Sequence, residues 1–327
     1  MTSARALWHV SAQQSELRAT ACDKGAEATD APLLRSEYSL ISTGTERLVA
    51  TGLVGPALYE SMRVPHMEGR FDFPVKYGYS LVARVVEQGH SLLGKLVHLL
   101  HPHQDYCRVP VNQFSLVPEG INAARATLAS NLETAVNAVW DGQVQIGDKV
   151  LVVGFGIIGA LLCEVLRQIP GVELHILEKN NNRITFGREM GFQIAGETTV
   201  SDFDLAFNTS INAAGLQSCI DRVGQESRVV ELSWYGTRPV QLQLGQSFHQ
   251  QRKQIVSSQV SQIAAPQRAR WDYARRKQLV FELLRNERFD RYLTHRIPFG
   301  ESPAFFEKLR NEPLDGMGYY INYNTAD

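Results

Sequence analysis

Hydroxyl and imidazole side chains occur in three short motifs of this 327-residue chain. Thr45 lies in STGTE, Tyr79 in KYGYS, and His103 in HPHQD. Such groups can donate a proton or a hydrogen bond to an oxygen that gains negative charge, so all three are candidate catalytic residues. Each also has a simpler interpretation: a turn or cap for Thr45, strand packing for Tyr79, and a surface loop for His103 and its neighbour His101. Tyr77 is expected to pack in its strand.

A glycine pattern further along the chain indicates a nucleotide-binding turn. Gly154, Gly156 and Gly159 have the spacing G-x-G-x-x-G, after the apolar run Val150–Val153 and before an apolar helix. This context supplies a tight turn, close backbone approach to a pyrophosphate, and a helix N-terminus facing anionic oxygens. The alternative is a glycine-rich turn without a nucleotide. The residues expected to contact a dinucleotide here are Gly154, Phe155, Gly156, Ile157, Ile158 and Gly159.

The end of the next strand bears on the choice between NAD and NADP. Glu178 ends that strand, 24 residues after Gly154. A carboxylate there can accept hydrogen bonds from both ribose hydroxyls and would repel a 2′-phosphate, which favours NAD. Lys179 and Arg183 follow and could hold a phosphate, so NADP stays possible. The alternative for Glu178 is a solvated strand end.

The elements that must position these residues change character along the chain. Up to about residue 120, short β-branched runs alternate with glycine or proline turns, which predicts a β-rich domain. From Val150 on, strands alternate with helices, which predicts a parallel sheet with right-handed crossovers. The run Arg268–Arg288 predicts one long helix. The sequence therefore predicts an α/β protein with more than one domain.

Composition narrows the classes of partner. The net charge is −1, from 33 basic and 34 acidic residues, which gives no general attraction for nucleic acid or anionic membranes. No apolar run is long enough to cross a bilayer. Arg275–Lys277 is expected to form a solvated basic face. The four cysteines lie far apart without a C-x-x-C pair, which favours a cytoplasmic protein without disulfides.

Several motifs, in the same order along nearly the whole chain, resemble the medium-chain dehydrogenase/reductase superfamily, which includes the alcohol dehydrogenases. They are ISTGTERLVATG, KYGYSLVARVVEQG, SNLETAVNAVWDGQVQIGDKVLVVGFGIIG and ELSWYG. The resemblance implies a GroES-like β-rich substrate domain and a Rossmann domain with a doubly wound parallel sheet. We expect the first over residues 1–130, the NAD(P)-binding domain over 131–258, and a C-terminal return to the substrate domain over 259–327.

The chain departs from the zinc-dependent relatives at each zinc-binding motif. Where they carry a cysteine, as in C-G-T-D, this chain has Thr43, and where they carry the histidine of G-H-E it has Tyr79. The third ligand position falls near Ser130 and Asn131. Catalytic zinc needs three strong nitrogen, sulfur or carboxylate donors. The cysteine-rich lobe of the structural zinc is also missing, so we expect neither zinc.

The resemblance also suggests roles for single residues. Thr45 matches a hydroxyl that relays protons in the alcohol dehydrogenases, and Tyr79 takes the vacant metal-ligand position. Thr134 is expected near the nicotinamide. Residues after two later strands are expected to line the same pocket, because ligands bind beyond the carboxyl ends of parallel strands; they are Thr209, Ser210, Trp234 and Tyr235. His249 and Arg252 are expected either to meet a polar substrate or to lie on an exposed helical face.

The leading hypothesis is a zinc-independent, NAD(P)-dependent oxidoreductase that moves hydride between nicotinamide and a carbonyl or alcohol of a small molecule. One alternative is a catalytically silent NAD(P)-binding sensor or scaffold. Another is an enoyl or quinone reductase that acts on double bonds. By resemblance we expect a homodimer, with QIVSSQV near the paired sheet edge. Neither a nucleic acid nor a membrane partner is expected.

Overall fold

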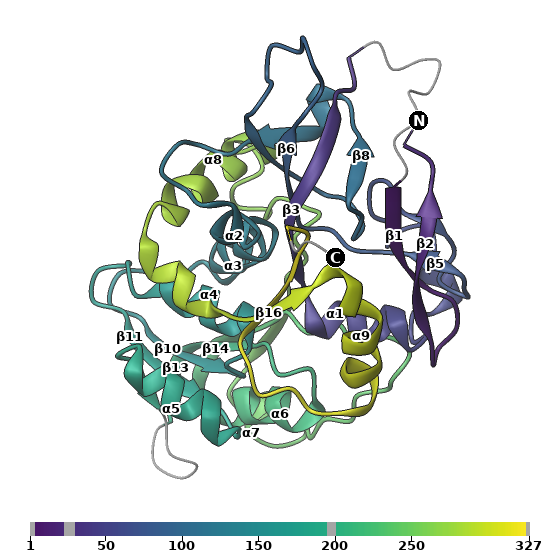
Figure 1. The fold of residues 1–327 in the computed structure, drawn as a ribbon. Coiled ribbons are helices and arrows are strands. Elements are labelled where there is room, and N and C mark those ends of the chain that lie inside the picture. Colours follow the sequence, from purple (N-terminus) through teal and green to yellow (C-terminus); the bar gives the residue numbers. More distant parts are fainter. Residues whose placement is uncertain (1–3, 23–29, 195–200, 325–327) are drawn as a thin grey trace. The chain divides into compact units, whose positions relative to one another are not determined.

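The computed structural model describes residues 4–22, 30–194 and 201–324 (Figure 1). The chain divides into two compact units. Unit 1 comprises Met1–Ser130, Phe281–Leu314 and Gly318–Asp327, and unit 2 comprises Asn131–Val280 and Asp315–Met317. Within the described residues, no helix is both long and apolar enough to cross a membrane.

Unit 1 is built on two β-sheets within the described residues. The smaller sheet has the order β2-β1-β5-β4 and the larger has the order β16-β17-β3-β6-β7-β9, with β8 also paired to β3. The strands of the smaller sheet are β1 (Ala4–His9), β2 (Ser15–Thr20), β4 (Glu68–Gly69) and β5 (Val75–Lys76). The strands of the larger sheet are β3 (Leu33–Ile41), β6 (Leu81–Val85), β7 (Leu96–Leu99), β8 (Tyr106–Arg108), β9 (Phe114–Leu116), β16 (Leu293–Pro298) and β17 (Gly318–Asn322).

Apolar side chains at alternate positions of its strands explain how the larger sheet packs. In β6, Leu81, Ala83 and Val85 are buried in a core cluster with Val97 of β7 and Leu34 of β3. One face of each strand therefore buries apolar area, which stabilises the pairing register. The helices of this unit are α1 (Thr43–Ala50), α2 (Ala123–Ala126) and α9 (Ser302–Asn311), with short 3-10 helices η1 (Pro56–Leu58), η2 (Val111–Gln113), η3 (Glu287–Tyr292) and η4 (Phe299–Glu301).

Unit 2 contains a parallel sheet whose described strands have the order β12-β11-β10-β13-β14-β15. They are β10 (Lys149–Val153), β11 (Glu173–Leu177), β12 (Gln193–Ile194), β13 (Phe203–Asn208), β14 (Val223–Glu231) and β15 (Gln254–Ser257). The order places β10 and β13 in the middle, and their apolar residues are buried, as expected for central parallel strands. The α/β fold with a Rossmann-like parallel sheet is therefore confirmed.

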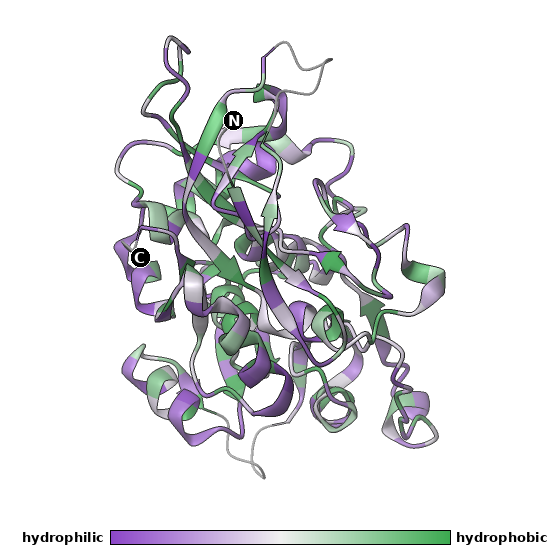
Figure 2. Ribbon diagram, turned by 45° about the vertical axis from the view of Figure 1, so that its right-hand side comes forward, coloured by the Kyte–Doolittle hydropathy of each residue, from purple (hydrophilic) through white to green (hydrophobic). Residues whose placement is uncertain are grey.

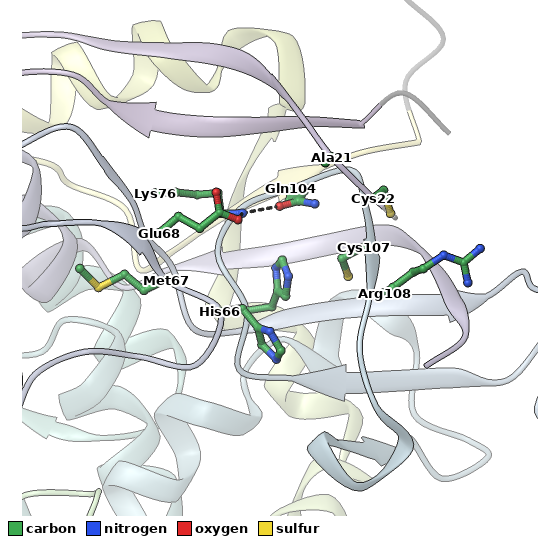
Figure 3. Close-up of a pocket in the computed structure, with 10 residues that line it drawn as sticks. Ala21, Cys22, His66, Met67, Glu68, Lys76, Gln104, Cys107 and Arg108 are labelled. Atoms are coloured by element: carbon green, nitrogen blue, oxygen red, sulfur yellow. Dashed lines mark hydrogen bonds and ion pairs between the residues drawn. The ribbon is translucent and has the colours of Figure 1, made fainter. Parts of the chain in front are cut away.

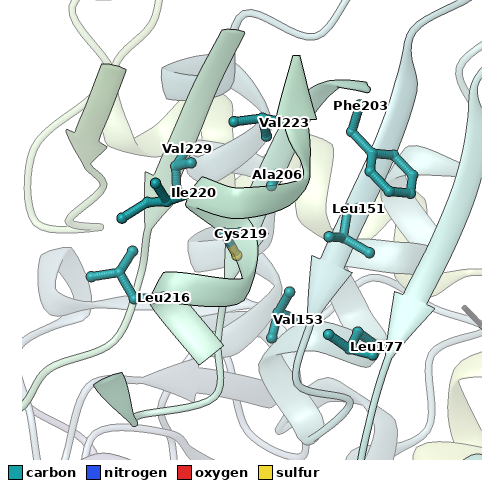
Figure 4. Close-up of a cluster of buried hydrophobic side chains, with 10 residues drawn as sticks. All are labelled: Leu151, Val153, Leu177, Phe203, Ala206, Leu216, Cys219, Ile220, Val223 and Val229. Atoms are coloured by element: carbon teal, nitrogen blue, oxygen red, sulfur yellow. The ribbon is translucent and has the colours of Figure 1, made fainter. Parts of the chain in front are cut away.

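Helices follow most of these strands. They are α3 (Ala129–Gly142), α4 (Ile157–Leu166), α5 (Asn181–Glu189), α6 (Ala213–Arg222), α7 (Ser247–Gln250) and α8 (Tyr273–Leu284). Figure 4 shows Leu216, Cys219 and Ile220 of α6 packed on the sheet beside Leu151 and Val229. In Figure 2 many helices carry both hydrophobic and hydrophilic residues, as amphipathic helices on a sheet do.

Two expectations for the region after β15 were wrong. The predicted helix Arg268–Arg288 is shorter, because α8 covers only Tyr273–Leu284. The basic run Arg275–Lys277 is also not a solvated face throughout. Arg276 is buried and its guanidinium lies 3.3 Å from the buried Glu133 carboxylate, which also pairs with Lys277. A carboxylate on α3 thus attracts two cations that periodicity alone placed outside.

Candidate active site

Tyr79 stands in the segment between β5 and β6, and its hydroxyl meets two others. The Ser42 and Thr45 side chains hydrogen-bond to the Tyr79 hydroxyl, so α1 brings Thr45 to Tyr79. Burial raises the pKa of Tyr79 to about 12, and the nearby Glu46 carboxylate adds to the increase, while the two hydrogen bonds oppose it. Tyr79 is therefore a protonated hydroxyl at neutral pH. We name Ser42, Thr45 and Tyr79 the hydroxyl cluster.

Gly78 and Tyr77 fix the backbone and the ring of Tyr79. Gly78 has a φ of +133°, and a Cβ there would lie 3.0 Å from the backbone nitrogen of His103. A side chain is therefore disfavoured at this position. The Tyr77 ring is 2% exposed and meets the Tyr79 ring edge to face, at 6.1 Å between centroids. The expectation that Tyr77 is a packing residue is confirmed.

A buried hydrogen bond between His103 and Glu46 adjoins the hydroxyl cluster. His103 Nε2 is 2.8 Å from Glu46 Oε2, and Glu46 Oε1 accepts the backbone N–H of Ser42 at 2.8 Å. The other ring nitrogen of His103 lies 2.7 Å from Ser39 Oγ, which is 2.8 Å from the Tyr323 hydroxyl. His103 has no exposed side-chain surface. The structure thus places His103 inside unit 1, where it connects to the cluster through Glu46.

The residues that the resemblance assigns to the three metal-ligand positions lie in this same part of unit 1. Thr43 begins α1, and Ser130 Oγ donates to the Tyr79 carbonyl oxygen at 2.9 Å. Within the described residues there is no group of three or more His, Cys, Asp or Glu side chains placed to hold a metal ion. The donors present are hydroxyls, which do not fit the ligand set of catalytic zinc.

The glycine turn of unit 2 has the geometry that its spacing predicts. Gly154 adopts a φ of +94°, and a Cβ on Gly159 would lie 2.1 Å from the Gly154 carbonyl oxygen. A Cβ on Gly156 would instead meet only the Arg183 guanidinium, at 3.7 Å. Gly154 thus makes the turn, Gly159 allows close packing of α4, and Gly156 leaves space at the start of α4. Ile157 and Ile158 begin that helix.

The Glu178 carboxylate lies against the same turn. Its Oε2 accepts the N–H of Phe155 at 2.7 Å, and its Oε1 accepts the N–H groups of Lys179 and Asn180 at 2.7 and 2.9 Å. A carboxylate oxygen can accept two hydrogen bonds, so Oε2 keeps one acceptor position. Lys179 itself is exposed.

Polar side chains meet beyond the carboxyl ends of β13 and β14. Asn208 Nδ2 donates to Glu231 Oε2 at 2.7 Å, and the Tyr235 hydroxyl donates to the same oxygen at 3.0 Å. Burial and the Glu231 charge raise the pKa of Tyr235. Ser210 Oγ donates to Asn208 Oδ1 at 2.7 Å, and Thr209 Oγ1 donates to the Gly154 carbonyl oxygen at 2.8 Å.

Sequence reasoning missed Asn208 and Glu231. The available signal was that each is a polar residue ending an apolar strand of a parallel sheet. Three other predicted residues differ in their exposure. Thr134 is partly buried in α3, Trp234 is partly buried after β14, and His249 is exposed in α7.

The chain has recognisable relatives, although no model of a known protein family matches it. It is 25% identical over 191 residues to D-guloside 3-dehydrogenase of Escherichia coli, covering 54% of this chain and 55% of the relative. It is 24% identical over 135 residues to 2-dehydro-3-deoxy-L-galactonate 5-dehydrogenase of Pseudoalteromonas atlantica, covering 38% and 39%. The chain thus spans about half or less of the length of these relatives.

Solved structures match over nearly the whole length. L-idonate 5-dehydrogenase of Escherichia coli superimposes with a TM-score of 0.79 at 12% identity, over 98% of this chain and 99% of that one. Acetophenone reductase of Geotrichum candidum, solved with NAD, gives 0.74 at 15% identity, over 98% and 97%. The chain has the medium-chain alcohol dehydrogenase fold. The expected resemblance is confirmed at this level, with unit 1 holding the GroES-like sheets and unit 2 the Rossmann sheet of that fold.

Proposed function

We propose that this chain is a zinc-independent oxidoreductase that moves hydride between a nicotinamide dinucleotide and a carbonyl or alcohol of a small molecule. The observation that carries this proposal is the hydroxyl cluster. Tyr79 stands where the zinc-dependent relatives have a ligand, and its pKa of about 12 keeps it protonated. The medium-chain fold and the dehydrogenase relatives support the reaction class.

The chemistry assigned to the cluster is proton transfer. A bound nicotinamide would supply or accept the hydride. During reduction, Tyr79 donates a hydrogen bond to the carbonyl oxygen, and its proton moves to that oxygen as negative charge develops. The Ser42 and Thr45 hydroxyls then stabilise the phenolate through their hydrogen bonds to Tyr79. In oxidation the substrate proton returns by the same route.

His103 acts in this proposal as a positioning residue. Its full burial and its contact with Glu46 support a role in holding α1, rather than direct contact with a substrate. Glu46 in turn holds the backbone of Ser42. A direct proton-donating role for His103 stays a prediction.

Zinc independence rests on the donors available. Thr43, Tyr79 and Ser130 offer neutral hydroxyls at the ligand positions, and such groups bind Zn²⁺ far more weakly than thiolate or imidazole. Zinc determination on protein purified without chelator tests this part separately. A stoichiometric amount of zinc bound per chain would contradict it.

We propose NAD as the cofactor. An open Gly156, the N-terminus of α4 and the Glu178 carboxylate fit a dinucleotide pyrophosphate and ribose. Thr134, Thr209, Ser210, Trp234 and Tyr235 are proposed near the nicotinamide. Both named relatives act on sugar-derived compounds, so sugars, sugar alcohols and sugar acids are the first substrates to test.

We also propose a homodimer. β15 is an edge strand of the described sheet in unit 2, and Ile255 within it is 37% exposed. An edge strand with unpaired backbone groups and an exposed apolar side chain can pair with a second copy. Sedimentation at micromolar concentration tests this, and a monomer would contradict it.

The deciding experiment is a substrate panel of aldoses, alditols and aldonates, with NADH or NADPH for reduction and the oxidised forms for the reverse. We expect turnover in at least one class, and a large loss of kcat in Tyr79→Phe. Tyr77→Phe is the matched control, because it removes a neighbouring hydroxyl outside the cluster. An unchanged kcat in Tyr79→Phe would remove Tyr79 from the mechanism. Cofactor binding without turnover on any substrate would favour a sensor instead.

A further inference from the structure

A pocket lies in unit 1, between the smaller sheet and the segment that leads into β8 (Figure 3). Its volume is about 190 Å³, which is ample for a small molecule because one water needs only about 10–15 Å³. None of the hydroxyl-cluster residues lines it. The lining residues are Ala21, Cys22, His66, Met67, Glu68, Lys76, His101, Gln104, Cys107 and Arg108.

One wall of the pocket holds a buried ammonium group. The Lys76 side chain is 3% exposed, pairs with the Glu68 carboxylate and donates to Gln104 Oε1 at 2.9 Å. The dashed line in Figure 3 marks the contact between Lys76 and Gln104. Gln104 Nε2 donates to the Tyr106 carbonyl oxygen, which fixes the orientation of the amide. An ammonium group has three N–H donors, so one remains available to a ligand.

His101 provides a hydrogen-bond acceptor, in contrast to the donor that Lys76 provides. His101 Nδ1 lies 2.8 Å from the Pro102 carbonyl oxygen, which can only accept, so Nδ1 carries the proton and Nε2 carries a lone pair. Burial lowers the pKa of His101 to about 3, which keeps the ring neutral. No other hydrogen bond of His101 is found within the described part of the chain. His66 stacks on the ring at 5.0 Å between centroids and keeps it in place.

The charges around the pocket cancel. Glu68 neutralises Lys76, and the Arg108 guanidinium lies 2.8 Å from the Glu87 carboxylate. An anionic ligand would therefore gain little net attraction. The pocket offers instead one hydrogen-bond acceptor and one donor, each buried and held by protein partners. A ligand that meets both groups must supply one donor and one acceptor.

We propose that this pocket binds a small uncharged polyhydroxyl compound, with one hydroxyl donating to His101 Nε2 and a second oxygen accepting from Lys76 Nζ. A hydroxyl group is both donor and acceptor, so two hydroxyls of one polyol supply the donor and the acceptor that these two side chains need. The half-exposed Glu68, at 53% of its side chain, lies at the rim and leaves the pocket reachable from solvent. This site is separate from the proposed hydride transfer and does not depend on it.

The test is a titration of the full chain with xylitol, without any nicotinamide nucleotide, followed by NMR of the histidine side-chain nitrogens. We expect a saturable shift of the His101 Nε2 resonance, because that atom gains a hydrogen bond. Gluconate and inorganic phosphate are titrated in parallel as anionic probes. Absence of a saturable xylitol shift overturns the proposal, and so does a shift produced by phosphate or gluconate alone.

Substitutions of Lys76 and His101 test whether xylitol binds in this pocket. Lys76→Met keeps the length of the side chain and removes the donor, so we expect xylitol affinity to fall by about tenfold. His101→Phe fills the acceptor side, and we expect calorimetric binding of xylitol to be lost. His295→Phe is the control, because His295 is exposed and stacks on Tyr319 away from the lining residues. Equal affinity in Lys76→Met and the native protein would contradict the assignment, even if His101→Phe failed to fold.

Discussion

His103 Nε2 and Glu46 Oε2 lie 2.8 Å apart inside unit 1, with side chains that are 0% and 1% exposed. The same glutamate accepts the backbone N–H of Ser42. One carboxylate therefore stabilises the start of α1 and fixes the histidine ring. Burying a carboxylate costs free energy, and its hydrogen bonds to His103 and the Ser42 N–H offset that cost.

Removing that carboxylate should cost stability. We expect Glu46→Ala to lower the free energy of unfolding by roughly 3–5 kcal/mol, because His103 and the Ser42 N–H lose their buried partner. Urea unfolding followed by circular dichroism measures this. Glu46→Gln should lose less, since its amide oxygen can still accept a hydrogen bond. Glu282→Ala is the control, because its pair with Arg285 is exposed and worth less than about 1 kcal/mol.

Substitutions of Gly156 and Gly159 should have different effects: the first should weaken cofactor binding, and the second should lower the stability of the fold. Gly156→Ala meets nothing closer than 3.7 Å, so the unfolding free energy should change little. Its methyl group would stand where the pyrophosphate approaches, so NADH affinity should fall by about tenfold or more. In Gly159→Ala the new Cβ would lie 2.1 Å from a carbonyl oxygen. That variant should lose stability by roughly 1–3 kcal/mol. Normal NADH binding by Gly156→Ala would argue against the proposed pyrophosphate position.

Cofactor preference should depend on Glu178 and Arg183 in opposite directions. Calorimetry should show tighter binding of NADH than of NADPH by the native chain. Glu178→Ala should narrow that preference, because the carboxylate no longer accepts a ribose hydroxyl or repels a 2′-phosphate. Arg183→Ala should weaken NADPH more than NADH. The exposed Arg188 offers Arg188→Ala as a control for general loss of positive charge, and tighter NADPH binding by the native chain would contradict the assignment.

Tyr79 predicts a particular pH dependence. Its pKa rises from about 10 in an unfolded chain to about 12, so its contribution to stability is complete below pH 10 and is lost as the pH rises through 12. Carbonyl reduction should therefore show no decline from Tyr79 ionisation between pH 7 and 10. Steady-state kinetics should show that Tyr79→Phe lowers kcat by about 100-fold or more. Thr45→Val should lower kcat less than Tyr79→Phe does, and it should raise the Tyr79 pKa, because the lost hydrogen bond from Thr45 lowers that pKa in the native chain. A Tyr79→Phe enzyme with native kcat over this pH range would refute the role.

The sequence predicted features that rest on local pattern. The G-x-G-x-x-G turn combines a strand, a glycine spacing and a helix within about 20 residues, and all of these appear as expected. The resemblance made Thr45 and Tyr79 separate candidates, and the contact between them was not predicted, since their separation in sequence carries no spacing signal. Glu46 was not predicted, because nothing in STGTE indicates that the glutamate points inward to His103.

Features that depend on contacts between segments far apart in the sequence could not be predicted from the sequence. The pocket beside Lys76 and His101 is lined from four separate parts of the chain. Its residues have no common period or motif. The burial of Arg276 likewise depends on Glu133 of α3, more than 140 residues earlier. Periodicity describes which face of a helix is apolar, and it does not report a charged partner on another element.

The order in which the ribosome makes the chain has a consequence for the larger sheet of unit 1. β17 (Gly318–Asn322) pairs with β3 (Leu33–Ile41), so this sheet needs one strand that is made before unit 2 and another that is made after it. Apart from Asp315–Met317, unit 2 is one continuous stretch. During translation, unit 2 can bury its core before β17 is available to pair with β3. The first 130 residues alone therefore expose a strand edge that a chaperone or a second nascent chain could engage.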